Sequence, residues 1–289
     1  MIIKVLGVKI NLAKRDEVLE KVRKYLQKFK VQSSKFKVKG IEPLVIFTPN
    51  PEIINYAQKD HLFKQIVNSA QINIPDGAGL CFAIEKKYHM KTDRLTGTDL
   101  MKDICQMSSK NSFTIGLIGG RGRVALDAKE CLITKYPSLL VEVLTPPEFK
   151  VESSKYKVVS IKKNIPDTKY LILNTEGNQT DRTELYFRNL VQEILDKKID
   201  ILFVALGFPK QEYFIESVKR EALRVKFKRS FVIMAVGGAF DYISGRVKRA
   251  PLWMREKGWE WLFRLIQEPW RLVRMLKGAR FFYKVIKYS

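Results

Sequence analysis

The 289-residue sequence has little of what a metal site or a disulfide framework requires. It contains two histidines, His61 and His89, which lie far apart and have no companions at ligand spacing. Its three cysteines, Cys81, Cys105 and Cys131, are widely spaced and odd in number. These spacings define neither a transition-metal cluster nor a set of disulfides, so we expect a chain that uses no metal and folds in a reducing compartment.

Long hydrophobic runs are also absent. No stretch reaches the roughly 18 uninterrupted apolar residues that a membrane-spanning helix needs. The N-terminal sequence MIIKVLGVKINLAKRDEV has no basic region followed by an apolar core of signal-peptide length. We therefore expect a cytoplasmic protein.

Acidic residues are scarce relative to basic ones, with 30 Asp+Glu against 53 Lys+Arg and a net charge of +23. Such an imbalance predicts an anionic partner, which on charge alone is a nucleic acid, an acidic lipid or a phosphorylated substrate. The excess is strong near the end of the chain, because residues 246–289 hold 12 Lys+Arg against 3 Asp+Glu, a net of +9.

Short apolar runs that end in turn residues and precede helical patterns predict an α/β fold, with a Rossmann-like, largely parallel sheet flanked by helices. The clearest runs are PLVIFTPNP (43–51), QINIPDG (71–77), FTIGLIGGRG (113–122), DILFVALGFPKQE (200–212) and FVIMAVGGAFD (231–241). Residues 1–245 are expected to form this core, and residues 246–289 a basic, helical appendage rich in aromatic residues. The stretches 28–40 and 150–181 have few apolar residues, which predicts linkers or surface insertions.

Ligands of such a sheet collect at the carboxyl ends of its strands. After the first run, Asn50 suits a helix N-cap and Pro51 the first helical position. That pattern fits a plain capped helix and equally an anion site at the helix start. Asp76 follows the second run, where a turn aspartate either satisfies backbone amides or acts as a general base with a raised pKa. The local sequence leaves both pairs of alternatives open.

The remaining strand ends carry glycines and polar side chains. GLIGGRGRV, with Gly119 and Gly120, matches neither the dinucleotide fingerprint nor the P-loop in full, although its backbone amides would suit a diphosphate. Gln211 begins a helix, where an amide either faces solvent or contacts a ligand. Gly237 and Gly238 would let the backbone close on a ligand.

Taken in order, several motifs resemble those of the WecG/TagA/CpsF family of bacterial glycosyltransferases over about residues 43–275. They are TPNPEIINYAQKD, NIPDGAGL, RLTGTDL, GLIGGRG, LFVALGFPKQE and VGGAFDYISGRVKRAPLWMREKGWEWLFRLIQEPWRL. The resemblance implies transfer of N-acetylmannosamine, or its uronic acid, from a UDP-sugar to N-acetylglucosamine on a polyprenyl diphosphate, with inversion and without a cofactor or metal. The lack of any Asp-x-Asp motif, which commonly holds a divalent ion under a nucleotide diphosphate, agrees with this.

The resemblance also assigns roles to residues. It makes Asp76 the base that deprotonates the acceptor hydroxyl. It places other side chains and glycine amides on the substrates, namely Thr48, Asn50, Arg94, Gln211, Gly119, Gly120, Gly237 and Gly238. It directs three arginines of the appendage, Arg264, Arg271 and Arg274, to the diphosphate of the lipid-linked acceptor. The stretches 28–40 and 150–181 depart from the family pattern, which bears on the choice of sugar.

Two other interpretations fit parts of the sequence. A charge of +23 would also suit a nucleic-acid-binding or RNA-modifying protein. In WEWLFRLIQEPWRLVRM (259–275), however, arginines alternate with leucine and tryptophan, as at a membrane interface. We therefore expect a peripheral protein that binds the anionic inner face of the cell membrane and no nucleic acid. An inactive membrane scaffold is the other alternative, and the sequence leaves a monomer or a homo-oligomer open.

Overall fold

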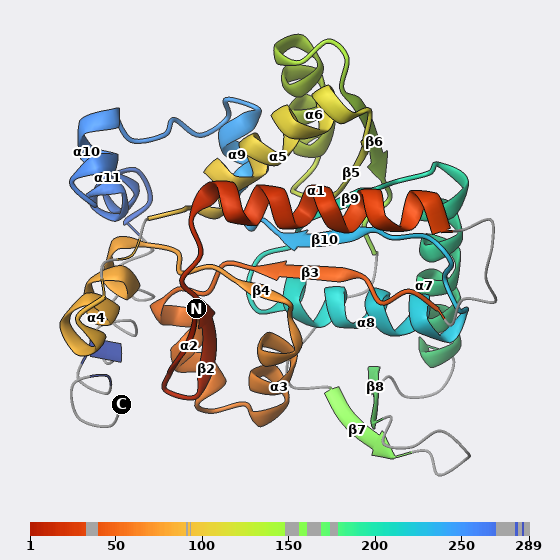
Figure 1. The fold of residues 1–289 in the computed structure, drawn as a ribbon, viewed down its shortest axis with the longest axis horizontal. Helices are drawn as coiled ribbons and strands as arrows, with labels where there is room; N and C mark the ends of the chain where they lie inside the picture. The colour runs from red at the N-terminus through yellow and green to blue at the C-terminus, as the bar shows by residue number, and fades with distance from the viewer. Residues whose placement is uncertain are drawn as a thin grey trace.

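A six-stranded, all-parallel sheet forms the centre of the protein in the computed structural model (Figure 1). The structure describes residues 1–32, 40–90, 92, 94–147, 156–160, 169–173, 179–269, 281, 282 and 285. The strand order is β4 (Ile72–Asn73), β3 (Leu44–Phe47), β10 (Val232–Ala235), β9 (Ile201–Ala205), β5 (Thr114–Gly119) and β6 (Leu140–Leu144). The predicted α/β class is confirmed, and each of the five quoted runs contains one of these strands.

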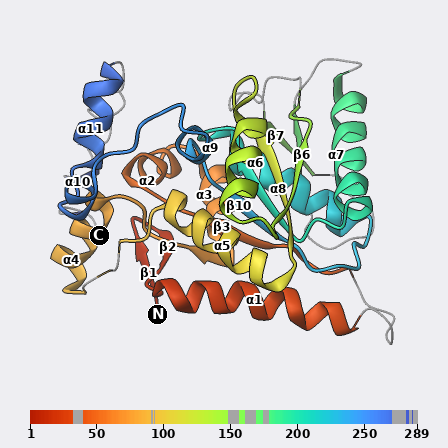
Figure 2. The ribbon, with the colours of Figure 1, turned by 90° about the horizontal axis from the view of Figure 1, so that it is seen from above.

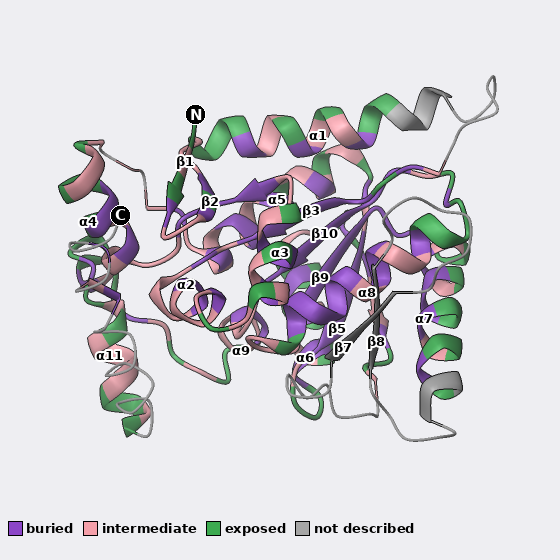
Figure 3. Cartoon of the chain, turned by 90° about the horizontal axis from the view of Figure 1, so that it is seen from below, coloured by how far each residue is buried: buried purple, intermediate pink, exposed green. Residues whose placement is uncertain are grey.

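The strands alternate between two apolar layers, since successive side chains of a strand point to opposite faces. In β9, Ile201 and Phe203 face one core cluster, whereas Leu202 and Val204 face the other. Both faces are therefore covered by helices, as a parallel sheet requires. Figure 3 shows the strands buried between helices whose outer sides are exposed.

Helices of one layer contribute to the cluster that contains Ile201, and Figure 2 shows α1 lying along that face of the sheet. They are α1 (Arg15–Gln32), α5 (Gly97–Asn111), α6 (Val124–Lys135) and α9 (Ala239–Ile243). The opposite cluster receives α2 (Pro51–Ala57), α3 (His61–Ser69), α4 (Ala78–Tyr88), α7 (Gln179–Asp196) and α8 (Lys210–Arg224). The result is a three-layer α/β/α arrangement.

Two antiparallel strand pairs that were not predicted from the sequence lie outside the main sheet. β1 (Ile2–Val5) pairs with β2 (Val8–Asn11) through a turn in which Leu6 and Gly7 both have positive φ. β7 (Tyr156–Ser160) pairs with β8 (Lys169–Leu173) inside the stretch 150–181 that was expected to be a linker or insertion. That stretch thus contains regular structure, while residues 150–155, 161–168 and 174–178 lie outside the described part of the chain.

The expectation of a linker from residue 28 is wrong for its first part. α1 continues to Gln32, because its apolar residues at helical spacing (Val18, Val22 and Leu26) are buried and each further residue adds a backbone hydrogen bond. Residues 33–39 are outside the described chain.

The appendage begins with α10 (Leu252–Glu256) and α11 (Glu260–Gln267), which stand beside α4 at the end of the molecule away from α7 (Figures 1 and 2). α11 ends two residues before Pro269, as expected of a chain approaching a proline. Farther along, Phe281 and Val285 are buried in the core cluster that includes Leu80 and Ile84 of α4. The division into a core and an appendage at residue 245 stays a prediction.

Candidate active site at the carboxyl edge of the sheet

The turns that follow five neighbouring strands lie along one edge of the sheet, because the strands are parallel. Asp76 follows β4, Thr48 and Asn50 follow β3, and Gly237 with Gly238 follows β10. Gln211 lies in the first turn of α8 after β9, while Gly119 ends β5 and Gly120 follows it. The predicted site residues of the core are thus gathered at this edge, apart from Arg94, which precedes α5.

Backbone groups bind both the N–H and the carboxylate of Asp76. Its N–H donates to the carbonyl of Pro49 at 2.8 Å, and its carboxylate accepts from the backbone amides of Gly97 and Gly77. Burial and the charge of Glu260 together raise the pKa of Asp76 to about 6, against the opposing effects of Arg94 and the two amides. A carboxylate with a pKa just below neutral is ionised in the cell and is a competent proton acceptor.

Thr48 and Asn50 flank Pro49, whose carbonyl accepts the N–H of Asp76. A Cβ on Gly97 would lie 3.0 Å from Thr48 Oγ1, so the absence of a side chain at Gly97 lets Thr48 approach the backbone that binds Asp76. Asn50 Oδ1 accepts the N–H of Ile53 at 2.9 Å, which confirms Asn50 as the N-cap of α2. Whether either side chain also contacts substrate stays a prediction.

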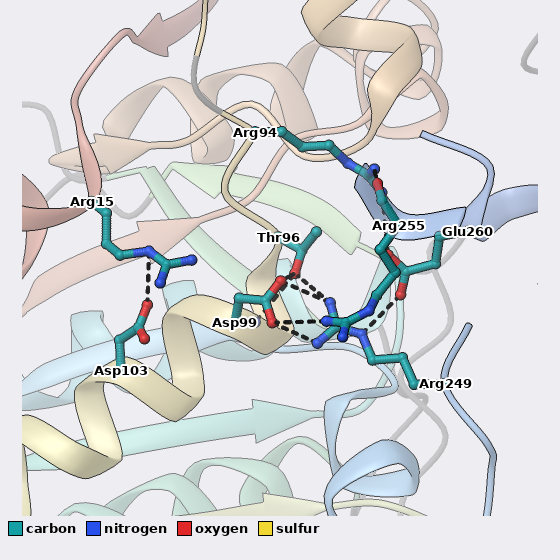
Figure 4. A network of polar contacts seen from close by, with 8 residues as sticks. All are labelled: Arg15, Arg94, Thr96, Asp99, Asp103, Arg249, Arg255 and Glu260. Carbon is teal, nitrogen blue, oxygen red and sulfur yellow. Dashed lines mark hydrogen bonds and ion pairs between the residues drawn. The ribbon is translucent and has the colours of Figure 1, made fainter. Parts of the chain in front are cut away.

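A cluster of alternating charges connects the appendage to the start of α5 (Figure 4). Arg249 binds Asp99 through two contacts, Nη1–Oδ1 at 2.5 Å and Nη2–Oδ2 at 2.8 Å. Its Nε lies 3.0 Å from Glu260 Oε1, while Glu260 Oε2 lies 3.2 Å from Arg94 Nη2. Arg94 Nη1 also donates to the backbone carbonyl of Arg255. The arginine that the family resemblance directs to substrate is therefore held by two groups of the appendage.

The cluster contains groups that the sequence analysis did not single out. Thr96 caps α5 by accepting the N–H of Asp99 at 3.2 Å, a pairing that the spacing in RLTGTDL would have indicated. Burial works to raise the pKa of Asp99, but hydrogen bonds from Arg249 and Thr96 outweigh it and hold that pKa at about 2. No comparable local pattern marks Arg249 or Glu260, whose partners are remote in sequence.

Gln211 connects two neighbouring strand ends. It is buried, its Oε1 accepts the N–H of Gly237 at 3.0 Å, and its Nε2 donates to Glu212 Oε1 at 3.0 Å. The alternative of a solvent-facing amide is thus wrong, because the side chain turns inward across β9 and β10. Glu212 is 1% exposed, and its Oε2 accepts no hydrogen bond among the described residues.

Glu212 predicts a pH dependence of stability. Burial raises its pKa to about 7 from 4.5, with Glu52 adding to the rise and hydrogen bonds from Gln211 and its own backbone opposing it. Between these pH values the folded protein holds a proton that the unfolded chain has released, so the free energy of unfolding falls as pH rises and levels off above about 7. Glu212→Gln should remove this loss and raise the free energy of unfolding at pH 8 by up to about 3 kcal/mol, at 1.4 kcal/mol per pKa unit.

Denaturant unfolding at pH 5 and pH 8 measures this effect. The Glu212→Gln protein should gain over wild type at pH 8 and little at pH 5, while Glu130→Gln, at an exposed position on α6, should match wild type at both. Equal stability differences at the two pH values would show that Glu212 does not titrate in this window.

Glycines Gly119 and Gly120 have packing roles beside β9. A Cβ on Gly119 would lie 2.8 Å from the carbonyl of Ala205, and Gly119 has φ of 100°. The N–H of Gly120 donates to that carbonyl at 2.9 Å. The close approach of β5 and β9 therefore requires glycine at position 119, and the positive φ of 81° favours glycine at position 120. The proposed contact of both glycines with a diphosphate stays a prediction.

Arg264 reaches the sheet edge from α11. Its Nη2 lies 2.9 Å from where a Cβ of Gly238 would be, and its guanidinium carbon lies 4.9 Å from the centre of the Tyr242 ring. Gly238 thus leaves room for an appendage arginine at the end of β10. The structure brings Arg264 to the candidate site, whereas Arg271 and Arg274 lie outside the described residues.

The outer side of α10 and α11 exposes several large apolar side chains: Leu252, Trp253, Trp259, Trp261 and Ile266. Lys257 Nζ lies 5.9 Å from the ring centre of Trp253 and 5.4 Å from that of Trp259, distances typical of cation–π contacts. Exposed tryptophans beside a lysine are typical of a surface that meets the lipid–water interface. No helix of the described chain is long and apolar enough to cross a bilayer.

Comparison with known proteins identifies relatives of the whole chain. The family model described as the glycosyl transferase WecG/TagA/CpsF family matches residues 3–289. The chain is 30% identical over 243 residues to an N-acetylglucosaminyldiphosphoundecaprenol N-acetyl-beta-D-mannosaminyltransferase of Bacillus subtilis (strain 168), covering 84% of this chain and 79% of the relative. It is 26% identical over 244 residues to a protein of the same name from Staphylococcus aureus (strain MW2), covering 84% and 80%.

Proposed function

The chain belongs to the glycosyl transferase WecG/TagA/CpsF family, and we propose that it transfers N-acetylmannosamine, or its uronic acid, from a UDP-sugar to N-acetylglucosamine carried on a polyprenyl diphosphate. The names of the Bacillus and Staphylococcus relatives state an N-acetylmannosaminyl group as the sugar and N-acetylglucosaminyldiphosphoundecaprenol as the acceptor. The observation that carries the proposal for this chain is Asp76, a carboxylate with a raised pKa at the sheet edge where α/β proteins bind ligands.

The proposed reaction is a single in-line displacement. The acceptor hydroxyl attacks the anomeric carbon of the donor, its proton passes to the Asp76 carboxylate, and the bond from that carbon to the UDP oxygen breaks. One base on the face opposite the leaving group is sufficient for such an inverting step. UDP leaves with the bonding electrons, so fixed hydrogen-bond donors and positive charge near its diphosphate would stabilise the transition state.

Arg264 at Gly238 supports a role for the appendage in holding a diphosphate, because a guanidinium is well suited to bind phosphate oxygens. The exposed tryptophans of α10 and α11 support attachment to the inner face of the cell membrane, where a polyprenyl lipid resides. We also propose that transfer needs no metal. The sequence contains no Asp-x-Asp motif, which commonly holds a divalent ion under a nucleotide diphosphate.

A donor panel tests this proposal. The full-length protein is incubated with UDP-sugars and a soluble GlcNAc-diphosphate lipid analogue, with and without a chelator, and UDP release is followed. We expect acceptor-dependent release from UDP-N-acetylmannosamine or its uronic acid, unchanged by the chelator. Absence of UDP release from every donor would contradict the activity, and loss of release with chelator alone would contradict metal independence.

A further inference from the structure

Glu260, on the first turn of α11, is the part of the appendage that reaches both sides of the charge cluster. Its two carboxylate oxygens bind different arginines, Oε1 to Arg249 Nε at 3.0 Å and Oε2 to Arg94 Nη2 at 3.2 Å. The Glu260 and Arg249 side chains are only 15% and 12% exposed, so water does little to screen this pair. A carboxylate shared in this way fixes the separation of two guanidinium groups.

We propose that Glu260 is a positioning residue for glycosyl transfer: its carboxylate holds Arg94 and Arg249 and sets the electrostatic field at Asp76. The inference deepens the proposed function and rests on it for the identity of the reaction. An acidic residue in the largely basic appendage thus controls the catalytic base.

Glu260 acts on the site partly through Arg94. Arg94 Nη1 donates to the carbonyl of Arg255, and its Nη2 contacts Glu260, so the appendage holds both terminal nitrogens. Arg94 Nε is buried and makes no hydrogen bond among the described residues. Without Glu260, the guanidinium would lose its anionic partner and be free to turn toward the nearest remaining carboxylates, which include Asp76.

The charges around Asp76 give the direction of the effect. Glu260 of α11 raises the pKa of Asp76, whereas Arg94 before α5 lowers it, as do the amides of Gly97 and Gly77. Cys81 of α4 is a further titratable group close to Asp76, and burial raises its own pKa, so it stays an uncharged thiol at neutral pH. Removing the Glu260 charge therefore lowers the pKa of Asp76 and makes it a weaker base.

Arg249 explains why the position of Glu260 is well defined. Asp99 binds the Nη atoms of Arg249 and Glu260 binds its Nε, so the arginine is fixed between α5 and α11. Thr96 Oγ1 adds a contact to Arg249 Nη2 at 3.1 Å. The same hydrogen-bonded cluster therefore holds the appendage at the start of α5 and sets the charges around the base.

The first test reads Asp76 directly and does not depend on activity. The carboxyl carbon of Asp76 is titrated by NMR in the full-length protein labelled with ¹³C-aspartate, with Asp76→Asn to assign its signal. Glu260→Gln should lower the titration midpoint by about half a unit or more, since a nearby like charge is removed. Glu260→Asp, which keeps the charge, should stay closer to wild type, and Glu256→Gln, at an exposed position of α10, should not move it.

The second test reads the reaction. In Glu260→Gln the acidic limb of the pH profile of kcat/KM should move toward lower pH, as the Asp76 titration does. The plateau value of kcat should fall roughly 10-fold because Arg94 is displaced. An unchanged Asp76 titration in Glu260→Gln would overturn the inference even if wild type is active. An inactive wild type with a shifted titration would instead sink the proposed reaction and leave the electrostatic role of Glu260 standing.

Discussion

Replacing Asp76 with asparagine is expected to lower the rate of transfer by roughly 10²- to 10⁴-fold while binding of the UDP-sugar survives. The amide has nearly the same shape as the carboxylate, and its oxygen can still accept a backbone hydrogen bond of the kind that Gly97 and Gly77 donate to Asp76. It cannot take the proton of the acceptor hydroxyl at neutral pH. Transfer is measured as acceptor-dependent UDP release, and donor binding by calorimetry on the same preparation.

Folding of the Asp76→Asn protein is the necessary control. Because burial raises the pKa of Asp76, the ionised carboxylate opposes folding above that pKa, and a neutral side chain should not lower the melting temperature at pH 8. Asp196→Asn, at an exposed position of α7 far from the site, should keep wild-type activity. A fully active Asp76→Asn protein would refute the assignment of the base.

Removal of residues from 246 onward is expected to abolish both membrane binding and turnover on a lipid-linked acceptor. The truncated protein lacks the exposed tryptophans of α10 and α11, and it loses Arg264 from the sheet edge and Glu260 from Arg94. Membrane binding is measured by sedimentation with anionic liposomes beside a parallel RNA-binding assay. Salt-sensitive RNA binding without liposome binding would favour the nucleic-acid alternative, and full activity of the truncated protein would contradict the role of the appendage.

A milder variant separates these effects from damage to the core, since truncation also removes Phe281 and Val285, which are buried. Arg264→Ala keeps the tryptophans and should retain liposome binding while weakening turnover. Arg246→Ala, which removes an ion pair with Asp127 at the surface, serves as the matched control. If Arg264→Ala and Arg246→Ala have equal turnover, Arg264 does not act on substrate.

The main sheet could be predicted because its strands are short, apolar and followed by turn residues, and parallel pairing then places Asp76, Thr48 and Gln211 at one edge. The hairpin of β1 and β2 could not, because its turn uses Leu6 with φ of 48°, a residue that seldom adopts that conformation. β7 (YKVVS) and β8 (KYLIL) do contain apolar and β-branched residues, but they are short segments of a basic stretch whose low overall apolar density predicted a linker or an insertion.

The site was predictable where side chains follow strands and unpredictable where they come from the appendage. Arg249 and Asp99 are separated by 150 positions, and no periodicity relates such partners. Glu260 was hidden by its neighbours, because the basic and aromatic residues of the segment direct attention to membrane and phosphate binding. Only the contacts of Glu260 with Arg94 and Arg249 show that this acidic residue faces the charge cluster.

The most direct test of the proposed function is the mass of the acceptor. The full-length protein is incubated with UDP-N-acetylmannosamine and a GlcNAc-diphosphate lipid analogue, and the analogue is analysed by intact-mass spectrometry beside an Asp76→Asn reaction. We expect addition of a single N-acetylhexosamine by wild type and almost none by the variant. Formation of UDP with an unchanged acceptor, or equal addition by both proteins, would contradict the proposed function.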